Sequence, residues 1–112
     1  MRAEDSVRIR HMIDAAQAAL KFAQGRTRPD LDTDQMLQFA LVRAIEIVGE
    51  AASKVSLEAR LDTPQIPWAV IIGMRNRLVH AYFETNHDVL WATVIQALPE
   101  LLAQLEAPRR PQ

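Results

Sequence analysis

Apolar side chains recur at helical spacing along most of the chain. In the first segment, from Glu4 to Gln24, they fall on one face of a helix, and Asp5 and Ser6 are residue types that cap helix starts. Gly25 follows the last turn, where glycine commonly ends a helix. We expect the core face of this helix to consist of Ile9, Met12, Ile13, Ala16, Leu20 and Ala23.

A second long helix is predicted from about Asp34 to Val55, after the polar connection Arg26–Thr33. Gly49 lies inside this helix, where glycine costs roughly 1 kcal/mol relative to alanine. Either a neighbour approaches closely at this position or the defect is tolerated. The expected core face of the helix consists of Leu37, Leu41, Ala44, Val48, Ala51 and Val55.

Two prolines punctuate the middle of the chain. Leu57–Leu61 is expected to form a short helical turn before them. Pro64 and Pro67 then exclude a continuous helix, although Pro67 suits the first turn of a new one. The next helix is therefore predicted over about Trp68–His80.

Asn86 is the expected N-cap of a last helix from His87 to about Glu106, which Pro99 should kink. Its expected core face consists of Leu90, Val94, Ala97, Leu101 and Leu105. No segment alternates in the manner of a strand, and the predicted loops are short. We therefore predict an all-α protein, a four-to-five-helix bundle in one domain over residues 1–106, with a frayed tail at 107–112.

The composition of the chain excludes several kinds of site and several classes of protein. The 112 residues suit one domain, and the absence of cysteine excludes disulfides, thiolate metal sites and a cysteine nucleophile. A net charge of −1 provides no overall positive field for nucleic acid, so any such site has to be local. No apolar run approaches the ~20 residues of a membrane span, and Met1–Arg10 is too charged for a signal peptide. We expect a cytoplasmic protein that does not act at a membrane.

The histidines do not indicate a metal site. His80, Glu84 and His87 resemble a run of ligands, but they lie across a predicted loop and helix start and lack a fourth ligand. Glycine-rich phosphate loops are also absent from the sequence. We therefore expect neither a metal nor another cofactor.

Arg75 falls within the apolar face of the predicted helix over Trp68–His80. A guanidinium there needs a partner or an open pocket, and Glu46 or Glu50 of the second helix could pair with it. His80 follows five residues later, about 140° around a straight helix, so one helix does not aim both side chains at one point. Either the helix ends early or the two groups meet between symmetry-related copies. A purely structural role, with a capping histidine and an ion-paired arginine, stays open.

The order Arg75-x4-His80-x-Tyr82, with Asn76 one turn before the histidine, resembles the signature of the HepT-like family of the HEPN superfamily. The resemblance covers about Glu4 to Glu106. Further segments that carry it are Arg10–Ile13, Ile47–Ala52, Ile66–Trp68, Trp91 and Leu98–Leu101. The motif alone is short, but in this framework it is specific.

This resemblance implies a HEPN-like helical bundle that forms a homodimer. HepT-like proteins act as toxins in type VII-like toxin–antitoxin pairs, beside a minimal nucleotidyltransferase antitoxin. The resemblance makes Arg75 and His80 the catalytic residues of a metal-independent endoribonuclease that acts on RNA such as tRNA or mRNA. Asn76 takes a supporting role, and Tyr82 becomes the residue that the antitoxin adenylylates.

These residue types suit RNA cleavage. Histidine can take up or release a proton near neutral pH, and the permanently charged arginine can bind phosphate oxygens through two N–H groups. The alternative is a non-catalytic HEPN dimer that binds a nucleotide or docks the nucleotidyltransferase. A helical dimer with a purely structural arginine is the third reading. The complete set of Arg75, Asn76, His80 and Tyr82 favours the enzyme.

Overall fold

Helices form the bundle that the periodicity predicts. The computed structural model describes residues 1–78 and 86–107, and for residues 74–78 it describes the backbone alone. These ranges contain helices and turns but no strand, which confirms the all-α class. The elements are α1 (Ala3–Ala23), α2 (Asp30–Thr33), α3 (Gln35–Ser53), α4 (Leu57–Asp62), α5 (Trp68–Leu78), α7 (His87–Ala92), the π-helical turn η1 (Thr93–Ala97) and α8 (Leu98–Glu106).

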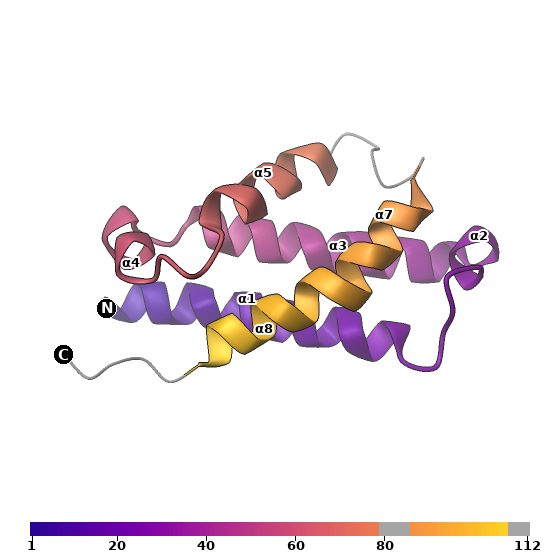
Figure 1. The fold of residues 1–112 in the computed structure, drawn as a ribbon, viewed down its shortest axis with the longest axis horizontal. Helices are drawn as coiled ribbons and strands as arrows, with labels where there is room; N and C mark the ends of the chain where they lie inside the picture. Colours follow the sequence, from indigo (N-terminus) through magenta and orange to yellow (C-terminus); the bar gives the residue numbers. More distant parts are fainter. Residues whose placement is uncertain (79–85, 108–112) are drawn as a thin grey trace.

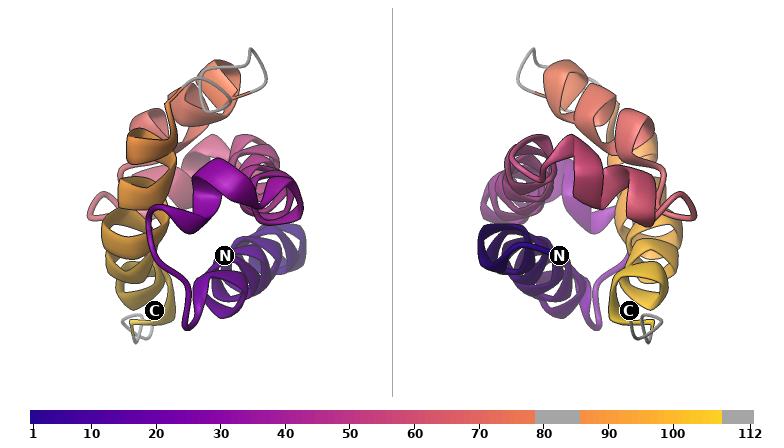
Figure 2. Two further views of the ribbon diagram at one scale, coloured as in Figure 1. Left: turned by 90° about the vertical axis from the view of Figure 1, so that its right-hand side faces the viewer. Right: turned by 90° about the vertical axis from the view of Figure 1, so that its left-hand side faces the viewer.

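The two long helices α1 and α3 run antiparallel and share the most extensive contact in the described structure (Figure 1). Helix α5 packs against α3, whereas η1 and α8 pack against α1. Viewed along the bundle, α5 and the α7–α8 helix therefore cover the α1–α3 pair from neighbouring sides (Figure 2). Each of these helices buries one apolar face, as the 3.6-residue spacing predicts.

Small side chains allow α1 and α3 to approach closely. The buried residues of α1 include Ala15, Ala16, Ala19 and Ala23, and those of α3 include Ala44, Gly49, Ala51 and Ala52. Gly49 is one of these buried residues, so it occupies a packed position in α3. Larger side chains fill the remaining core: Met12, Leu31, Leu41, Val55, Leu90, Val94 and Leu98 are each at most 2% exposed.

Several helix ends are where the sequence places them. Asp34 accepts a hydrogen bond from the Leu37 N–H at 3.0 Å, and Asn86 accepts one from the Val89 N–H at 3.1 Å. Gly25 has a φ of 73°, the left-handed conformation that ends α1 at little steric cost. The connection before Asp34 is not wholly irregular, however, because it contains the short helix α2.

The last helix differs from its prediction at one turn. We expect a kink at Pro99, and the structure has the π-helical turn η1 immediately before α8. Pro99 has no N–H to donate to the Ile95 carbonyl, and a wider turn accommodates that missing bond. The core face differs from the expected one at a single position, whereas Val94, Leu101 and Leu105 are buried as expected. Ala97, expected in the core, is exposed, and Leu98 is buried at 2% exposure in its place.

Asp5 does not cap α1, contrary to its predicted role. The N-cap residue is Arg2, which makes no side-chain capping bond. Asp5 is instead buried at 3% exposure and accepts two hydrogen bonds of 2.8 Å, from the N–H and the Oγ of Ser56. Ser56 is itself the N-cap of α4, so this carboxylate ties the start of α1 to the start of α4.

The buried Asp5 makes stability sensitive to acid. Its hydrogen bonds from Ser56 lower the pKa of the Asp5 carboxyl below the ordinary 3.8. A carboxyl whose pKa is lowered by folding contributes stability above its ordinary pKa and loses it as the pH falls through the folded value. We therefore expect the Asp5→Asn variant to be less stable than wild type at neutral pH, with a difference that shrinks between about pH 5 and pH 3.

Urea unfolding at several pH values measures this difference. Asp14→Asn removes an exposed carboxylate from the same helix and controls for the change in net charge. A difference between wild type and Asp5→Asn that stays constant down to pH ~3 would contradict a charged, hydrogen-bonded Asp5.

Candidate functional site

Helix α5 carries the first half of the sequence motif. Arg75 and Asn76 lie in its later turns, on a helix that packs along α3 and runs antiparallel to it (Figure 1). The side chains are described as far as Gly73, so the structure fixes the helical position of both residues and not their contacts. Arg75 comes one turn after Ile71, which is buried at 4% exposure. The position of the Arg75 side chain within the apolar face of α5 stays a prediction.

The start of α5 is firmly anchored. The indole Nε1 of Trp68 donates to the Thr63 hydroxyl at 3.1 Å and to the Thr63 carbonyl at 3.3 Å. Both residues are buried, at 7% and 4% exposure. Because the indole and Ile71 are held in the core, the axis of α5 is fixed before the chain reaches Arg75.

The second half of the motif lies outside the described residues. His80 and Tyr82 belong to the segment 79–85, and the description resumes at Asn86. The expected angular separation of Arg75 and His80 thus stays a prediction. In Figure 1 the last turn of α5 lies over the middle of α3, whereas the first turn of α7 lies nearer the end of the bundle that carries α2.

Glu46 and Glu50, the expected partners of Arg75, are partly buried residues of α3 that share a partner. Nη1 of Arg43 binds both carboxylates, at 3.3 Å from Glu46 Oε2 and 3.4 Å from Glu50 Oε1. Arg43 is thus a guanidinium partner that sequence reasoning did not assign to them. The structure supplies no contact between either carboxylate and Arg75, whose side chain is not described, so that pairing stays a prediction.

A polar cluster between α2 and α7 was not predicted from the sequence. It consists of Arg28, Asp32, His87 and Asp88, and we call it the α2–α7 cluster. Nδ1 of His87 lies 2.9 Å from Asp32 Oδ1, and Arg28 Nη1 donates to the same oxygen at 3.0 Å. Arg28 Nε also donates to Asp88 Oδ1 at 2.6 Å. The cluster therefore joins residues about 60 positions apart at the start of α7.

These contacts favour the charged forms of Asp32 and Arg28. The hydrogen bond from His87, followed by that from Arg28, lowers the pKa of the Asp32 carboxyl. The carboxylates of Asp88 and Asp32 in turn raise the pKa of the Arg28 guanidinium. The sequence indicates one contact of this cluster, because Arg28 and Asp32 are four residues apart, a spacing at which side chains meet on a helix. Their meeting with α7 depends on the tertiary fold, which the spacing does not contain.

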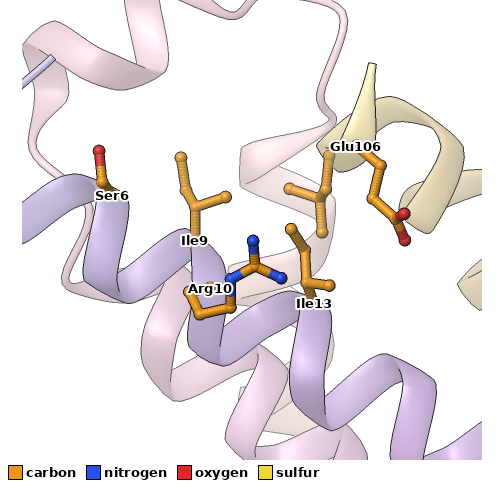
Figure 3. Close-up of a pocket in the computed structure, with 6 residues that line it drawn as sticks. Ser6, Ile9, Arg10, Ile13 and Glu106 are labelled. Carbon is orange, nitrogen blue, oxygen red and sulfur yellow. The ribbon is translucent and has the colours of Figure 1, made fainter. Parts of the chain in front are cut away.

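A pocket also opens between α1 and α8 (Figure 3). It is lined by Ser6, Ile9, Arg10, Ile13, Leu105 and Glu106. Gln17 Nε2 donates to Glu106 Oε1 at 3.4 Å beside it. The pocket lies near the start of α1, whereas α2 and the start of α7 are at the other end of the bundle (Figure 1). It therefore does not contribute residues to the motif region.

In the described part of the chain, no three side chains among His, Asp and Glu gather closely enough to hold a metal ion. The helices described there lack the combination of length and apolar character needed to cross a bilayer. His87, which the sequence places in a possible ligand run, instead contacts Asp32.

Comparison with known proteins identifies relatives over most of the chain. The model of the family described as "Ribonuclease HepT-like" matches residues 12–108. A protein of Caldanaerobacter subterraneus subsp. tengcongensis, named as a candidate RNase, is 33% identical over 98 residues, which cover 88% of each chain. A protein of Thermococcus cleftensis, named as a probable ribonuclease HepT, is 40% identical over 81 residues, covering 72% of this chain and 74% of the relative.

A third relative comes from Methanocaldococcus jannaschii and is also named as a candidate RNase. It is 28% identical over 95 residues, which cover 85% of this chain and 87% of the relative. No solved structure matches the chain.

Proposed function

This chain belongs to the ribonuclease HepT-like family, and we propose that it is an endoribonuclease that cleaves RNA without a metal ion. The observation that carries the proposal is the family match over residues 12–108, which includes the complete motif of Arg75, Asn76, His80 and Tyr82. The ribonuclease names of relatives that cover most of the chain support the same activity.

The proposed reaction uses the RNA's own 2′-hydroxyl as the nucleophile. A His80 imidazole removes its proton, and the oxygen attacks the adjacent phosphorus. The bond from phosphorus to the 5′-oxygen breaks, which leaves a 2′,3′-cyclic phosphate and a 5′-hydroxyl. A second, protonated His80 imidazole supplies the proton to the leaving oxygen. Arg75 stabilises the negative charge on the phosphorane through its N–H groups, and Asn76 orients the imidazole.

Two histidines are available if the site lies between two copies of the chain. The motif contains one histidine per chain, and a two-fold axis doubles it. The 140° separation of Arg75 and His80 around a straight helix also favours a shared groove over a site within one copy. Met36 and Phe39 of α3 are large apolar side chains that are 83% and 57% exposed, as expected where a partner subunit binds. We therefore propose a homodimer.

We further propose that the protein is the toxin of a toxin–antitoxin pair and that a minimal nucleotidyltransferase is its antitoxin. In the proposed reaction the Tyr82 oxygen attacks the α-phosphorus of ATP, a new P–O bond forms and pyrophosphate leaves. The phenolic proton passes to solvent. Tyr82 is close to Arg75 in sequence, and the attached AMP adds bulk and negative charge. In the proposal, this AMP competes with the phosphate of RNA for Arg75.

Incubation of the purified protein with total RNA, with and without EDTA, tests the activity. We expect cleavage that is unchanged by the chelator and products that end in a cyclic phosphate. Cleavage abolished by EDTA would contradict the metal-independent chemistry. An intact RNA pool together with tight nucleotide binding would instead support a non-catalytic HEPN dimer.

A further inference from the structure

The α2–α7 cluster lies at the start of α7, directly after the motif segment in the chain. His87 is the first residue of α7, and Asn86 caps the helix by accepting from the Val89 N–H at 3.1 Å. The Leu90 N–H bonds the Asn86 carbonyl at 3.2 Å. Arg28 and Asp32 hold this same first turn through Asp88 and His87. The cluster therefore holds the first turn of α7, which follows the motif segment in the chain.

The side chains of the α2–α7 cluster are too exposed for their contacts to contribute much to the free energy of unfolding. The exposed fractions of the side chains are 31% for Arg28, 54% for Asp32 and 81% for Asp88. Ion pairs exposed to this degree contribute little to the free energy of unfolding because water and salt screen them. His87 is the more buried member, at 19% exposure, and it contacts the carboxylate of Asp32 directly. We infer that these contacts orient the first turn of α7 and add little to the free energy of unfolding of the whole protein.

The connection between α1 and α3 contains a second arginine, Arg26, whose ion pairs are local. Arg26 binds Asp34 at 2.5 Å and lies 3.5 Å from Asp30, both close to it in sequence. Within the described part of the chain, neither of these two ion pairs reaches α7. Arg28, by contrast, contacts α7 through Asp88.

We propose that Asp32 and Arg28 are positioning residues for RNA cleavage, acting through His87 and Asp88 on the end of the segment that carries His80. This inference rests on the proposed ribonuclease function. None of the four side chains needs to touch RNA in this role. Loss of the cluster leaves substrate binding intact and reduces the fraction of bound complexes with His80 correctly placed, so it lowers kcat and leaves KM unchanged.

The test compares kcat and KM for RNA cleavage in Arg28→Ala, Asp32→Ala and His87→Ala, with Arg26→Ala as the matched control. We expect kcat to fall about 10-fold in each of the first three, with KM changed less than about 2-fold. The Asp32→Ala/His87→Ala double variant should lose no more than Asp32→Ala alone, because Asp32→Ala already removes the contact with His87 together with that to Arg28. Arg26→Ala should keep the wild-type kcat.

Hydrogen exchange at the Val89 and Leu90 amides gives the second readout. We expect faster exchange in Asp32→Ala than in Arg26→Ala, since the cluster holds the turn that contains these amides. If wild type cleaves RNA and the cluster variants keep the kcat of Arg26→Ala, the positioning role is wrong. If wild type does not cleave RNA, the proposed function itself fails, and the positioning role fails with it whatever the amides show.

Discussion

Replacing His80 with alanine is expected to lower kcat for RNA cleavage by about 10²–10⁴-fold, because the variant has no group to take or supply a proton at the reacting oxygens. The fold should persist, since the described core is formed by other residues. Cleavage of a labelled RNA by the purified variant measures the loss. Circular dichroism shows whether the helical fold remains, and size-exclusion chromatography shows whether the variant has the same oligomeric state as wild type.

His11→Ala provides the matched control for this substitution. His11 is an exposed histidine on α1, so the control changes the same residue type at a position remote from the motif in sequence. Its cleavage rate should equal that of wild type. A His80→Ala protein that cleaves RNA at the wild-type rate would exclude His80 as the acid or base.

Replacing Tyr82 with phenylalanine is expected to abolish adenylylation by the cognate nucleotidyltransferase, because the variant lacks the oxygen that attacks ATP. RNA cleavage by the variant should be close to that of wild type, since the proposed chemistry does not use the phenolic oxygen. Intact-mass spectrometry after incubation with the transferase and ATP measures the added AMP. The same samples, assayed for cleavage, show whether wild type is silenced and the variant is not.

Tyr82 is the only tyrosine in the sequence, so no second tyrosine can accept AMP in its place. Transferase without ATP is the control that separates modification from simple binding. AMP found on the Tyr82→Phe protein, or silencing of this variant that needs ATP, would be incompatible with Tyr82 as the modified residue.

The sequence predicts the helices well because their apolar spacing is regular. Asp34 and Asn86 begin their helices as expected, since each supplies a side-chain acceptor to a free N–H. The expected core face of the last helix is confirmed at Leu90, Val94, Leu101 and Leu105 and is wrong at Ala97, because apolar spacing assumes 3.6 residues per turn and η1 is wider. A proline indicates a disturbance in a helix, but it does not specify whether the chain kinks or inserts a residue. Ala97 and Leu98 exchange places for this reason.

Long-range polar contacts are harder to predict than helices. Asp5 has the residue type of a cap, and nothing in the sequence indicates that it bonds Ser56, 51 residues away. The same limit applies to Asp32 and His87, which are 55 residues apart. Arg75 and Asn76 are on α5 as predicted, because a helix follows directly from local spacing. The placement of His80 and Tyr82 lies outside the described residues and stays a prediction.

The shared groove between two copies is tested most directly by a mixed dimer of one wild-type and one His80→Ala chain. The two chains are coexpressed with different tags, and the mixed dimer is isolated on both tags. If each cleavage uses the imidazoles of both copies, the mixed dimer should retain less than about 1% of the wild-type rate, since one proton transfer lacks its catalyst. A mixed dimer with about half of the wild-type rate would show that each chain contains a complete site, and it would contradict the shared groove.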